Sequence, residues 1–235
     1  MAVSGAYEFS PARAAAAQAA AELLEEGMTV GLGSGRAVWS VIEAAGNRWP
    51  GRRPPIRVVV ASEATFALVH AAGIEVVQLD GEIELDIAID GADEIDPRLG
   101  LLKGGGGALL REKIVASAAR RFVVIAEDGK RVSRLGERSR LPVEVVRFGW
   151  RDTGRRIAHL LPDAARRAVG DEPYMTDEGH WILDCHIPEG ADAAELAAEL
   201  DRVPGVVAHG LFLGMAERVL LGTPAGGLEV LLAED

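Results

Sequence analysis

Glu112 is the residue of this sequence best suited to general-base chemistry. It ends the segment Lys103-Gly-Gly-Gly-Gly107-Ala-Leu-Leu-Arg-Glu112, in which four successive glycines precede an expected helix. Such a run presents backbone N–H groups to an anion, and the Lys103 ammonium stands beside it. The helical face that carries Glu112 is otherwise alanine and valine, so we expect burial to raise the pKa of its carboxyl toward neutrality. The structural alternative is a salt bridge between Glu112 and a nearby arginine.

A second group of reactive side chains closes the strand expected at residues 85–90. The segment is Asp90-Gly-Ala-Asp93-Glu94-Ile-Asp96, and ligands of open α/β sheets bind beyond the carboxyl ends of the strands. We therefore expect Asp90 and Asp93 to face the cleft and to address one small substrate together. The alternatives are a solvated acidic turn and a divalent-metal site. The spacing is not that of an EF-hand loop and no histidine lies within 15 residues, which disfavours a metal.

The third segment is the glycine-rich turn Gly31-Leu-Gly-Ser-Gly35, which precedes a helix that opens with Arg36. Glycines allow close approach of a ligand to the backbone, and the free N–H groups of a helix start attract anions. An arginine is electrostatically misplaced there unless an anion lies nearby, so the pattern favours phosphate binding over a plain tight turn. A dinucleotide site would need glycine in place of Arg36 and an acidic residue where Ala61-Ser62 follows the next strand. NAD is therefore not expected.

These segments lie between helices and strands that alternate over the first 130 residues. Helices are expected from Ser10-Pro11 to Leu24, over 37–45, after Ser62 as N-cap, and over 108–119. Strands are expected at 29–32, 57–61, 85–90 and 122–126. Strands separated by single helices are typical of βαβ units, which build a parallel sheet covered on both faces. The sequence therefore predicts a Rossmann-like α/β domain.

The order of the expected helices and strands changes after Lys130. Strands are expected at 141–148, 181–187 and 206–212, with helices at 155–161 and 191–200 between them. This order is typical of a small α+β lobe of the ferredoxin-like kind. We therefore predict a Rossmann-like catalytic domain over residues 1–136 and 208–235, into which a lobe of residues 137–207 is inserted. Residues 217–222 would return the chain to the large sheet.

The amino-acid composition indicates which kinds of binding partner can be excluded. The 235 residues carry a net charge of −11, with 49% hydrophobic and 26% charged residues, which indicates a globular protein that binds neither nucleic acid nor an anionic membrane. No apolar run approaches the roughly 20 residues of a transmembrane helix. The single cysteine, Cys185, excludes an intramolecular disulfide and favours a cytoplasmic location. We interpret it as an inert core residue.

The combined segments resemble type A ribose-5-phosphate isomerases over nearly the whole chain. The aspartate motif and the Lys-Gly-Gly-Gly-Gly motif are highly specific together. The matching segments are 30–35, 90–97, 102–113, 122–126 with Lys130, 141–145, 176–179, 182–184, 204–207 and 210–212.

The resemblance implies interconversion of ribose 5-phosphate and ribulose 5-phosphate through an enediolate, in the non-oxidative pentose phosphate pathway, without metal or organic cofactor. It implies that Glu112 is the base, that Asp90 and Asp93 handle hydroxyl protons and ring opening, and that Lys103 neutralises charge. It implies a phosphorylated sugar as partner and a homodimer or homotetramer. The substrate-binding residues implied are Arg13, Ser34, Gly35, Arg36, Ala37, Asp90, Gly91, Ala92, Asp93, Lys103, Gly104, Gly105, Gly106 and Lys130.

The chain departs from the family pattern at the phosphate-binding turn. Where the family has Gly-Thr-Gly-Ser-Thr, this chain has Gly33-Ser-Gly-Arg-Ala37, and Arg13 replaces a lysine of the first helix. We expect Arg36 and Arg13 to supply the phosphate contacts, because guanidinium binds phosphate bidentately. The departure leaves open a related sugar phosphate or a sugar acid as substrate. A sugar-phosphate-sensing domain is the alternative from another class, disfavoured by the acidic net charge and by the presence of Glu112.

Overall fold

The centre of the computed structural model, which describes residues 10–233, is a seven-stranded sheet in the order β16-β15-β7-β4-β1-β2-β3. All neighbouring strands are parallel except β16, which runs antiparallel to β15. The strands are β1 (Thr29–Leu32), β2 (Arg57–Val60), β3 (Glu75–Val76), β4 (Ile87–Gly91), β7 (Phe122–Glu127), β15 (Arg218–Gly222) and β16 (Leu228–Leu232). The predicted parallel sheet is confirmed, as is the return of the chain to it near residue 218. Its central strands are mostly apolar, with polar residues such as Thr29, Asp90 and Glu127 at their ends, because helices and further strands cover both faces.

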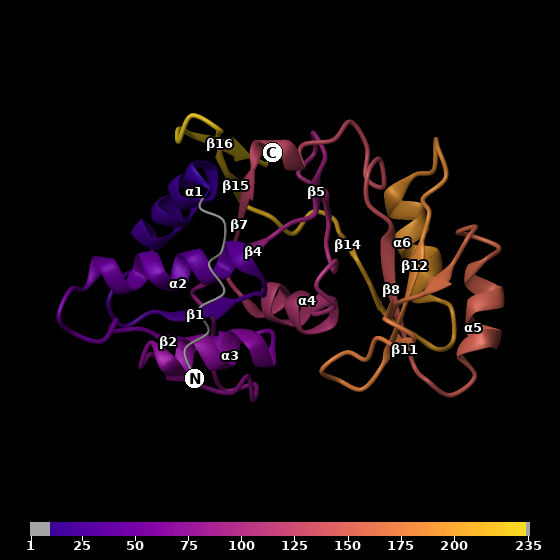
Figure 1. The fold of residues 1–235 in the computed structure, drawn as a ribbon, viewed down its shortest axis with the longest axis horizontal. Helices are drawn as coiled ribbons and strands as arrows, with labels where there is room; N and C mark the ends of the chain where they lie inside the picture. The colour runs from indigo at the N-terminus through magenta and orange to yellow at the C-terminus, as the bar shows by residue number, and fades with distance from the viewer. Residues whose placement is uncertain (1–9, 234–235) are drawn as a thin grey trace.

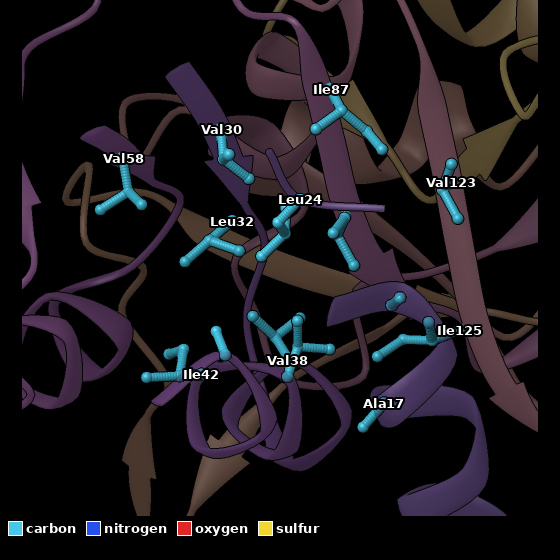
Figure 2. Close-up of a cluster of buried hydrophobic side chains, with 14 of the residues drawn as sticks. Ala17, Leu24, Val30, Leu32, Val38, Ile42, Val58, Ile87, Val123 and Ile125 are labelled. Carbon is cyan, nitrogen blue, oxygen red and sulfur yellow. The ribbon is translucent and has the colours of Figure 1, made fainter. Parts of the chain in front are cut away.

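Three helices pack on one face of this sheet. They are α1 (Pro11–Glu22), α2 (Arg36–Arg48) and α3 (Glu63–Ala71). Ser10 and Ser62 cap α1 and α3, because their hydroxyls accept the N–H groups of Arg13 and Thr65. The buried side chains between these helices and the sheet form one continuous core. Figure 2 shows part of it, including Val30, Ile87 and Val123 of the strands and Ala17, Val38 and Ile42 of the helices.

The opposite face is covered by α4 (Leu109–Ala118) and by a three-stranded antiparallel sheet in the order β14-β6-β5. The strands of this sheet are β5 (Glu94–Ile95), β6 (Leu101–Leu102) and β14 (Leu211–Phe212). A second core forms here, where Val115 of α4 and Phe212 of β14 pack against the sheet. Figure 1 shows α4, β5 and β14 between the large sheet and the remaining elements. A one-turn 3-10 helix, η1 (Asp128–Lys130), follows β7.

The remaining elements form a four-stranded antiparallel sheet in the order β13-β8-β12-β9, seen on the right of Figure 1. The chain order is β8 (Leu141–Val145), α5 (Trp150–Ile157), β9 (Ala165–Arg166), β12 (Trp181–Cys185), α6 (Ala193–Asp201) and β13 (Val206–His209). A two-stranded hairpin of β10 (Ala168–Val169) and β11 (Glu172–Pro173) precedes β12. This is the β-α-β-β-α-β order of ferredoxin-like motifs. The division into residues 1–136 with 208–235 and an inserted 137–207 stays a prediction.

The strands expected over 141–148 and 181–187 end earlier, at Val145 and Cys185, and two further predicted elements differ more. The strand expected over 206–212 is two strands, β13 and β14, which belong to different sheets. They part at Gly210, whose position a Cβ atom could not occupy because it would lie 2.2 Å from the carbonyl oxygen of Lys103. The helix expected over 155–161 begins earlier, at Trp150. Its N-cap, Gly149, has φ +66°, a conformation that glycine adopts readily and that ends the preceding segment.

None of the helices in residues 10–233 has both the length and the apolar character needed to cross a membrane.

Candidate active site

Asp90, Lys103 and Glu112 form one buried cluster of charges. Lys103 Nζ lies 2.9 Å from Asp90 Oδ2 and 3.2 Å from Glu112 Oε2, and the three side chains are 4%, 3% and 7% exposed, respectively. Lys103 Nζ also donates a hydrogen bond of 2.5 Å to the carbonyl oxygen of Gly91. Glu112 is thus ion-paired with Lys103, and not with an arginine as the structural alternative had it. One cation thus stands between two carboxylates that could each exchange protons with a ligand.

Three different elements bring this cluster together. Asp90 lies at the carboxyl end of β4, Glu112 in the first turn of α4, and Lys103 directly after β6. Lys103 is fixed through its own backbone, since its N–H donates to the carbonyl oxygen of Gly210 at 2.8 Å. Its ammonium also lies 5.4 Å from the centroid of the Phe212 ring. The segment 210–212, far along the chain, therefore holds Lys103 in place.

The glycine-rich turn after β1 holds Asp90 from the other side. Asp90 Oδ1 accepts the N–H groups of Ser34 at 3.3 Å and of Gly91 at 2.7 Å. Gly33 has to lack a side chain here, because a Cβ atom would lie 1.9 Å from the Asp90 carboxyl carbon. The Ser34 hydroxyl is hydrogen-bonded to Ser62 at 2.9 Å. The turn thus contacts a carboxylate directly, which the sequence pattern alone did not predict.

Burial dominates the electrostatics of the cluster. It raises the pKa of Glu112 to about 8, with a further increase from the negative charge of Asp90 and a partial decrease from Lys103. The pKa of Asp90 is also raised by burial, against the opposing effect of Lys103. Burial alone would lower the pKa of Lys103, but the two carboxylates raise it above its ordinary value. Lys103 is therefore a permanent cation at neutral pH, and Glu112 titrates in the range suited to general-base chemistry.

Asp93 is held by the glycine loop, which we define as Gly104–Gly107. The N–H of Gly105 donates to Asp93 Oδ2 at 2.8 Å, and the backbone N–H of Asp93 donates to the carbonyl oxygen of Leu102. Asp93 is near enough to contribute to the electrostatics of both Lys103 and Glu112. Asp90 and Asp93 thus both act on the charge of Lys103, and their joint contact with one small substrate stays a prediction.

Sequence analysis missed two residues that contact the glycine loop. Arg167 donates from Nη1 to the carbonyl oxygens of Gly104 and Gly105, at 2.9 and 3.1 Å. The Tyr174 hydroxyl donates to the carbonyl oxygen of Gly106 at 3.1 Å. Both come from the segment between β9 and β12, more than 60 positions along the chain, so no local spacing could have identified them.

A small hollow of about 50 Å³ lies at the carboxyl ends of β4 and β7, where Ala92 and Glu127 line it. Its lining includes Arg13, Ala37, Ala92 and Lys130, which are among the residues expected to bind substrate, and also Glu127. Arg13 is paired there with Glu127, at 3.1 Å. The hollow therefore brings together two cations, one of them already paired with the Glu127 carboxylate, and the start of α2.

Arg36 is an exposed residue of the adjoining cavity of about 630 Å³, which Arg13 also lines. Within residues 10–233 its guanidinium forms no ion pair. The helix that it begins has no side-chain cap, because Gly35 is the N-cap, and no acidic residue in its first turn. The start of α2 therefore remains positive and available to an anion.

Glu94 belongs to the aspartate motif but lies outside the cluster. Its carboxylate accepts the N–H groups of Gly136, Arg138 and Ser139, at 2.6, 2.8 and 2.5 Å. These contacts fix the 136–139 segment that leads into β8. Glu94 is thus a structural residue.

Two further sequence expectations concern a metal and the cysteine. In the described part of the chain, no group of three or more His, Cys, Asp or Glu side chains is arranged to hold a metal ion. Cys185 is fully buried, and burial raises the pKa of its thiol to about 12. Its interpretation as an inert core residue is confirmed.

Comparisons with known proteins give one consistent result. Residues 57–226 match the family model of ribose 5-phosphate isomerase A (phosphoriboisomerase A). A curated relative of Roseiflexus sp. (strain RS-1), named ribose-5-phosphate isomerase A, is 50% identical over 220 residues, which cover 93% of this chain and 94% of that protein.

Solved structures agree over nearly the full length. The ribose 5-phosphate isomerase A of Methanocaldococcus jannaschii is 35% identical with a TM-score of 0.87, covering 94% of this chain and 97% of that one. A D-ribose-5-phosphate isomerase in complex with phospho-erythronic acid is 30% identical with a TM-score of 0.85, covering 94% and 97%.

Proposed function

The chain belongs to the ribose 5-phosphate isomerase A family, and from this premise we propose that it interconverts D-ribose 5-phosphate and D-ribulose 5-phosphate with Glu112 as the base. The observation that carries the proposal is a buried carboxylate, Glu112, beside a buried cation, Lys103. Aldose–ketose isomerisation needs a base that takes a proton from carbon and a positive group that stabilises the resulting oxyanion. This pair supplies both.

In the forward direction, the Glu112 carboxylate takes the proton from C2 of the open-chain aldose. The electrons of the C2–H bond form the C1–C2 double bond, and those of the C1 carbonyl move to O1. The proton of the C2 hydroxyl is then lost from O2 while O1 gains one, and Glu112 returns its own proton to C1. Atoms and electrons balance, because the product is an isomer of the substrate.

Lys103 would stabilise the enediolate. It is already a cation before the substrate binds, since Asp90 and Glu112 raise its pKa. A fixed buried charge of this kind needs no reorganisation as negative charge develops on the sugar oxygens. Its three hydrogen-bond donors can reach a ligand oxygen while part of the ion pairing is kept.

Asp90 and Asp93 would handle the hydroxyl protons. Burial raises the pKa of Asp90 against the opposing effect of Lys103, and its carboxyl would exchange protons with a sugar oxygen. Asp93 is oriented by Gly105 on the same side of the cluster. We assign to this pair the opening of the furanose ring and the proton movement between O1 and O2.

The phosphate would bind at the hollow lined by Arg13, Ala37, Ala92 and Lys130, and Arg36 would reach it from the cavity that Arg13 also lines. Ser34, Gly35 and the N–H groups of the α2 start would complete this end, while Gly91 and Gly104–Gly106 would contact the sugar. A relative was solved in complex with phospho-erythronic acid, a ligand that carries a phosphate and a carboxylate resembling a planar enediolate. That complex supports a phosphorylated sugar as the ligand, and the place of its phosphate in this chain is our proposal. A sugar acid as substrate is the alternative that the altered turn leaves open.

The decisive experiment incubates the purified chain with ribose 5-phosphate in D₂O and EDTA. Proton NMR should show ribulose 5-phosphate with deuterium at C1. Arabinose 5-phosphate, the C2 epimer, is the matched control substrate and should react far more slowly. Failure to convert ribose 5-phosphate, with conversion of another sugar phosphate or sugar acid, would reject the proposed substrate.

A homodimer or homotetramer located in the cytoplasm completes the proposal. Sedimentation of the purified chain tests the oligomeric state, and a monomer at micromolar concentration would contradict it.

A further inference from the structure

The guanidinium of Arg167 connects the four-stranded sheet with the glycine loop through all three of its nitrogen atoms. Its Nε and Nη2 donate to the two carboxylate oxygens of Asp184, at 2.9 and 2.5 Å. Its Nη1 donates to the carbonyl oxygens of Gly104 and Gly105. The side chain is only 15% exposed, and its guanidinium lies 5.7 Å from the centroid of the Tyr174 ring. Arg167 is therefore held in one orientation by a bidentate partner.

The backbone of the same residue is also fixed. The N–H of Arg167 donates to the carbonyl oxygen of Ile182 at 2.8 Å, and its carbonyl accepts from Tyr174 N–H at 2.9 Å. Asp184 is in β12, paired with Ala165 of β9. The position of Nη1 is thus set by the four-stranded sheet and not by the glycine loop.

The hydrogen bonds from Arg167 to the carbonyl oxygens of Gly104 and Gly105 also fix where the N–H groups of the loop point. In a trans peptide, the carbonyl of one residue and the N–H of the next point in opposite directions. The carbonyls of Gly104 and Gly105 both point to Arg167, so the N–H groups of Gly105 and Gly106 point away from it. The first of these reaches Asp93. The second donates no hydrogen bond to any residue from 10 to 233.

We propose that Arg167 is a positioning residue of the isomerase, which orients the glycine loop so that Gly105 fixes Asp93 and the N–H of Gly106 faces a substrate oxygen. The proposal rests on the function proposed above. Four glycines in succession have little conformational preference of their own. One turn hydrogen bond lies within the loop, from Gly107 N–H to the carbonyl oxygen of Gly104, and Arg167 binds that same carbonyl oxygen from outside. Tyr174 assists by binding the carbonyl oxygen of Gly106.

The test replaces Arg167 by Met, which keeps the length of the side chain but removes its charge and donors. We expect kcat for ribose 5-phosphate to fall about 10–100-fold, the range for misplaced catalytic groups, with a smaller rise in KM. Arg167→Lys should restore little, because an ammonium cannot hold Asp184 and two carbonyls in one plane. Arg155→Met, at an exposed position of α5, is the matched control and should behave as wild type.

A double-mutant cycle separates positioning from simple stabilisation of the fold. If Arg167 acts through the glycine loop on Asp93, Arg167→Met should cost much less in an Asp93→Asn background than in the wild type. Fully additive losses, or a wild-type kcat in Arg167→Met, would overturn the proposal. If Arg167→Met does not fold, Tyr174→Phe removes only the hydroxyl bound to Gly106, and we expect a fall in kcat of about threefold to tenfold; an unchanged kcat would reject the proposal.

The wild-type chain distinguishes failure of this inference from failure of the proposed function. A wild type that is inactive on ribose 5-phosphate rejects the proposed substrate. The Arg167 variants are then compared on whichever sugar phosphate the wild type converts, and the same two outcomes decide the positioning role.

Discussion

Glu112 Oε2 lies 3.2 Å from Lys103 Nζ, yet accepts no aligned hydrogen bond from any residue between 10 and 233. The Lys103 ammonium is directed to Asp90 and to the carbonyl oxygen of Gly91 instead. Glu112 therefore has a buried carboxylate oxygen that accepts no hydrogen bond from these residues, although the Lys103 ammonium lies beside it. A carboxylate in this state is poised to take a proton from a ligand.

Glu112→Gln should abolish isomerisation while leaving substrate affinity within about tenfold. The amide keeps the shape of the side chain but cannot accept the C2 proton, and loss of a general base costs about 10²–10⁴ in rate. Deuterium incorporation from D₂O should vanish in parallel. Glu199→Gln, on the exposed side of α6, is the control. Retention of more than about a tenth of the wild-type kcat would show that Glu112 is not the base.

The pH dependence should report the buried carboxyl. The pKa of Glu112 is raised to about 8, and only its deprotonated form can act as base, so kcat/KM should rise with pH through that region. A carboxyl titration by ¹³C NMR, assigned with Glu112→Gln, avoids interference from the substrate phosphate. A Glu112 titration near its ordinary value of 4.5 would contradict the electrostatic interpretation.

Lys103→Met should lower kcat by about 10²–10³, the cost of removing one preorganised oxyanion donor. Without the cation, the negative charge of Asp90 is unopposed, so the pKa of Glu112 should increase further and the rising limb of kcat/KM should move to higher pH. Lys130→Met, which removes a more distant cation, should raise KM without moving the limb. If kcat/KM of Lys103→Met rose at the same pH as in the wild type, Lys103 would not influence the pKa of Glu112.

Arg36→Ala should raise KM for ribose 5-phosphate roughly 10–150-fold, the equivalent of a hydrogen bond to a charged group. Arg36→Lys should recover only part, because an ammonium cannot make the bidentate contact. The combined change Arg36→Ser with Ala37→Thr should retain phosphate recognition through hydroxyl groups. Steady-state kinetics of the three variants provide the test, and an unchanged KM in Arg36→Ala would exclude Arg36 from the phosphate site.

Glu94→Gln should destabilise the fold without removing the chemistry. The amide places an NH₂ group opposite backbone donors, and one unsatisfied buried donor costs about 1–3 kcal/mol. Urea unfolding should show this decrease in the free energy of unfolding, and Glu199→Gln again serves as control. The remaining folded enzyme should keep its kcat. A large fall in kcat at unchanged stability would place Glu94 in the mechanism.

Much of the fold could be predicted from the sequence because its signals are local. Apolar runs such as Phe122–Ala126 are needed wherever a strand is buried on both faces, and Ser62 satisfies the free N–H of Thr65 within one turn. The burial of Glu112 followed from the small apolar residues on its helical face. The large parallel sheet and the candidate carboxylates could therefore be predicted from the sequence alone.

The tertiary structure alone decided how the charges pair. Asp93 and Glu94 are neighbours, yet one is bound by Gly105 and the other by the 136–139 segment, because successive side chains point in opposite directions. Lys103, not an arginine, is the partner of Glu112, since strand β6 places it there. Arg167 reaches the glycine loop across 63 residues. Such contacts depend on how separate sheets pack, and no local spacing encodes that.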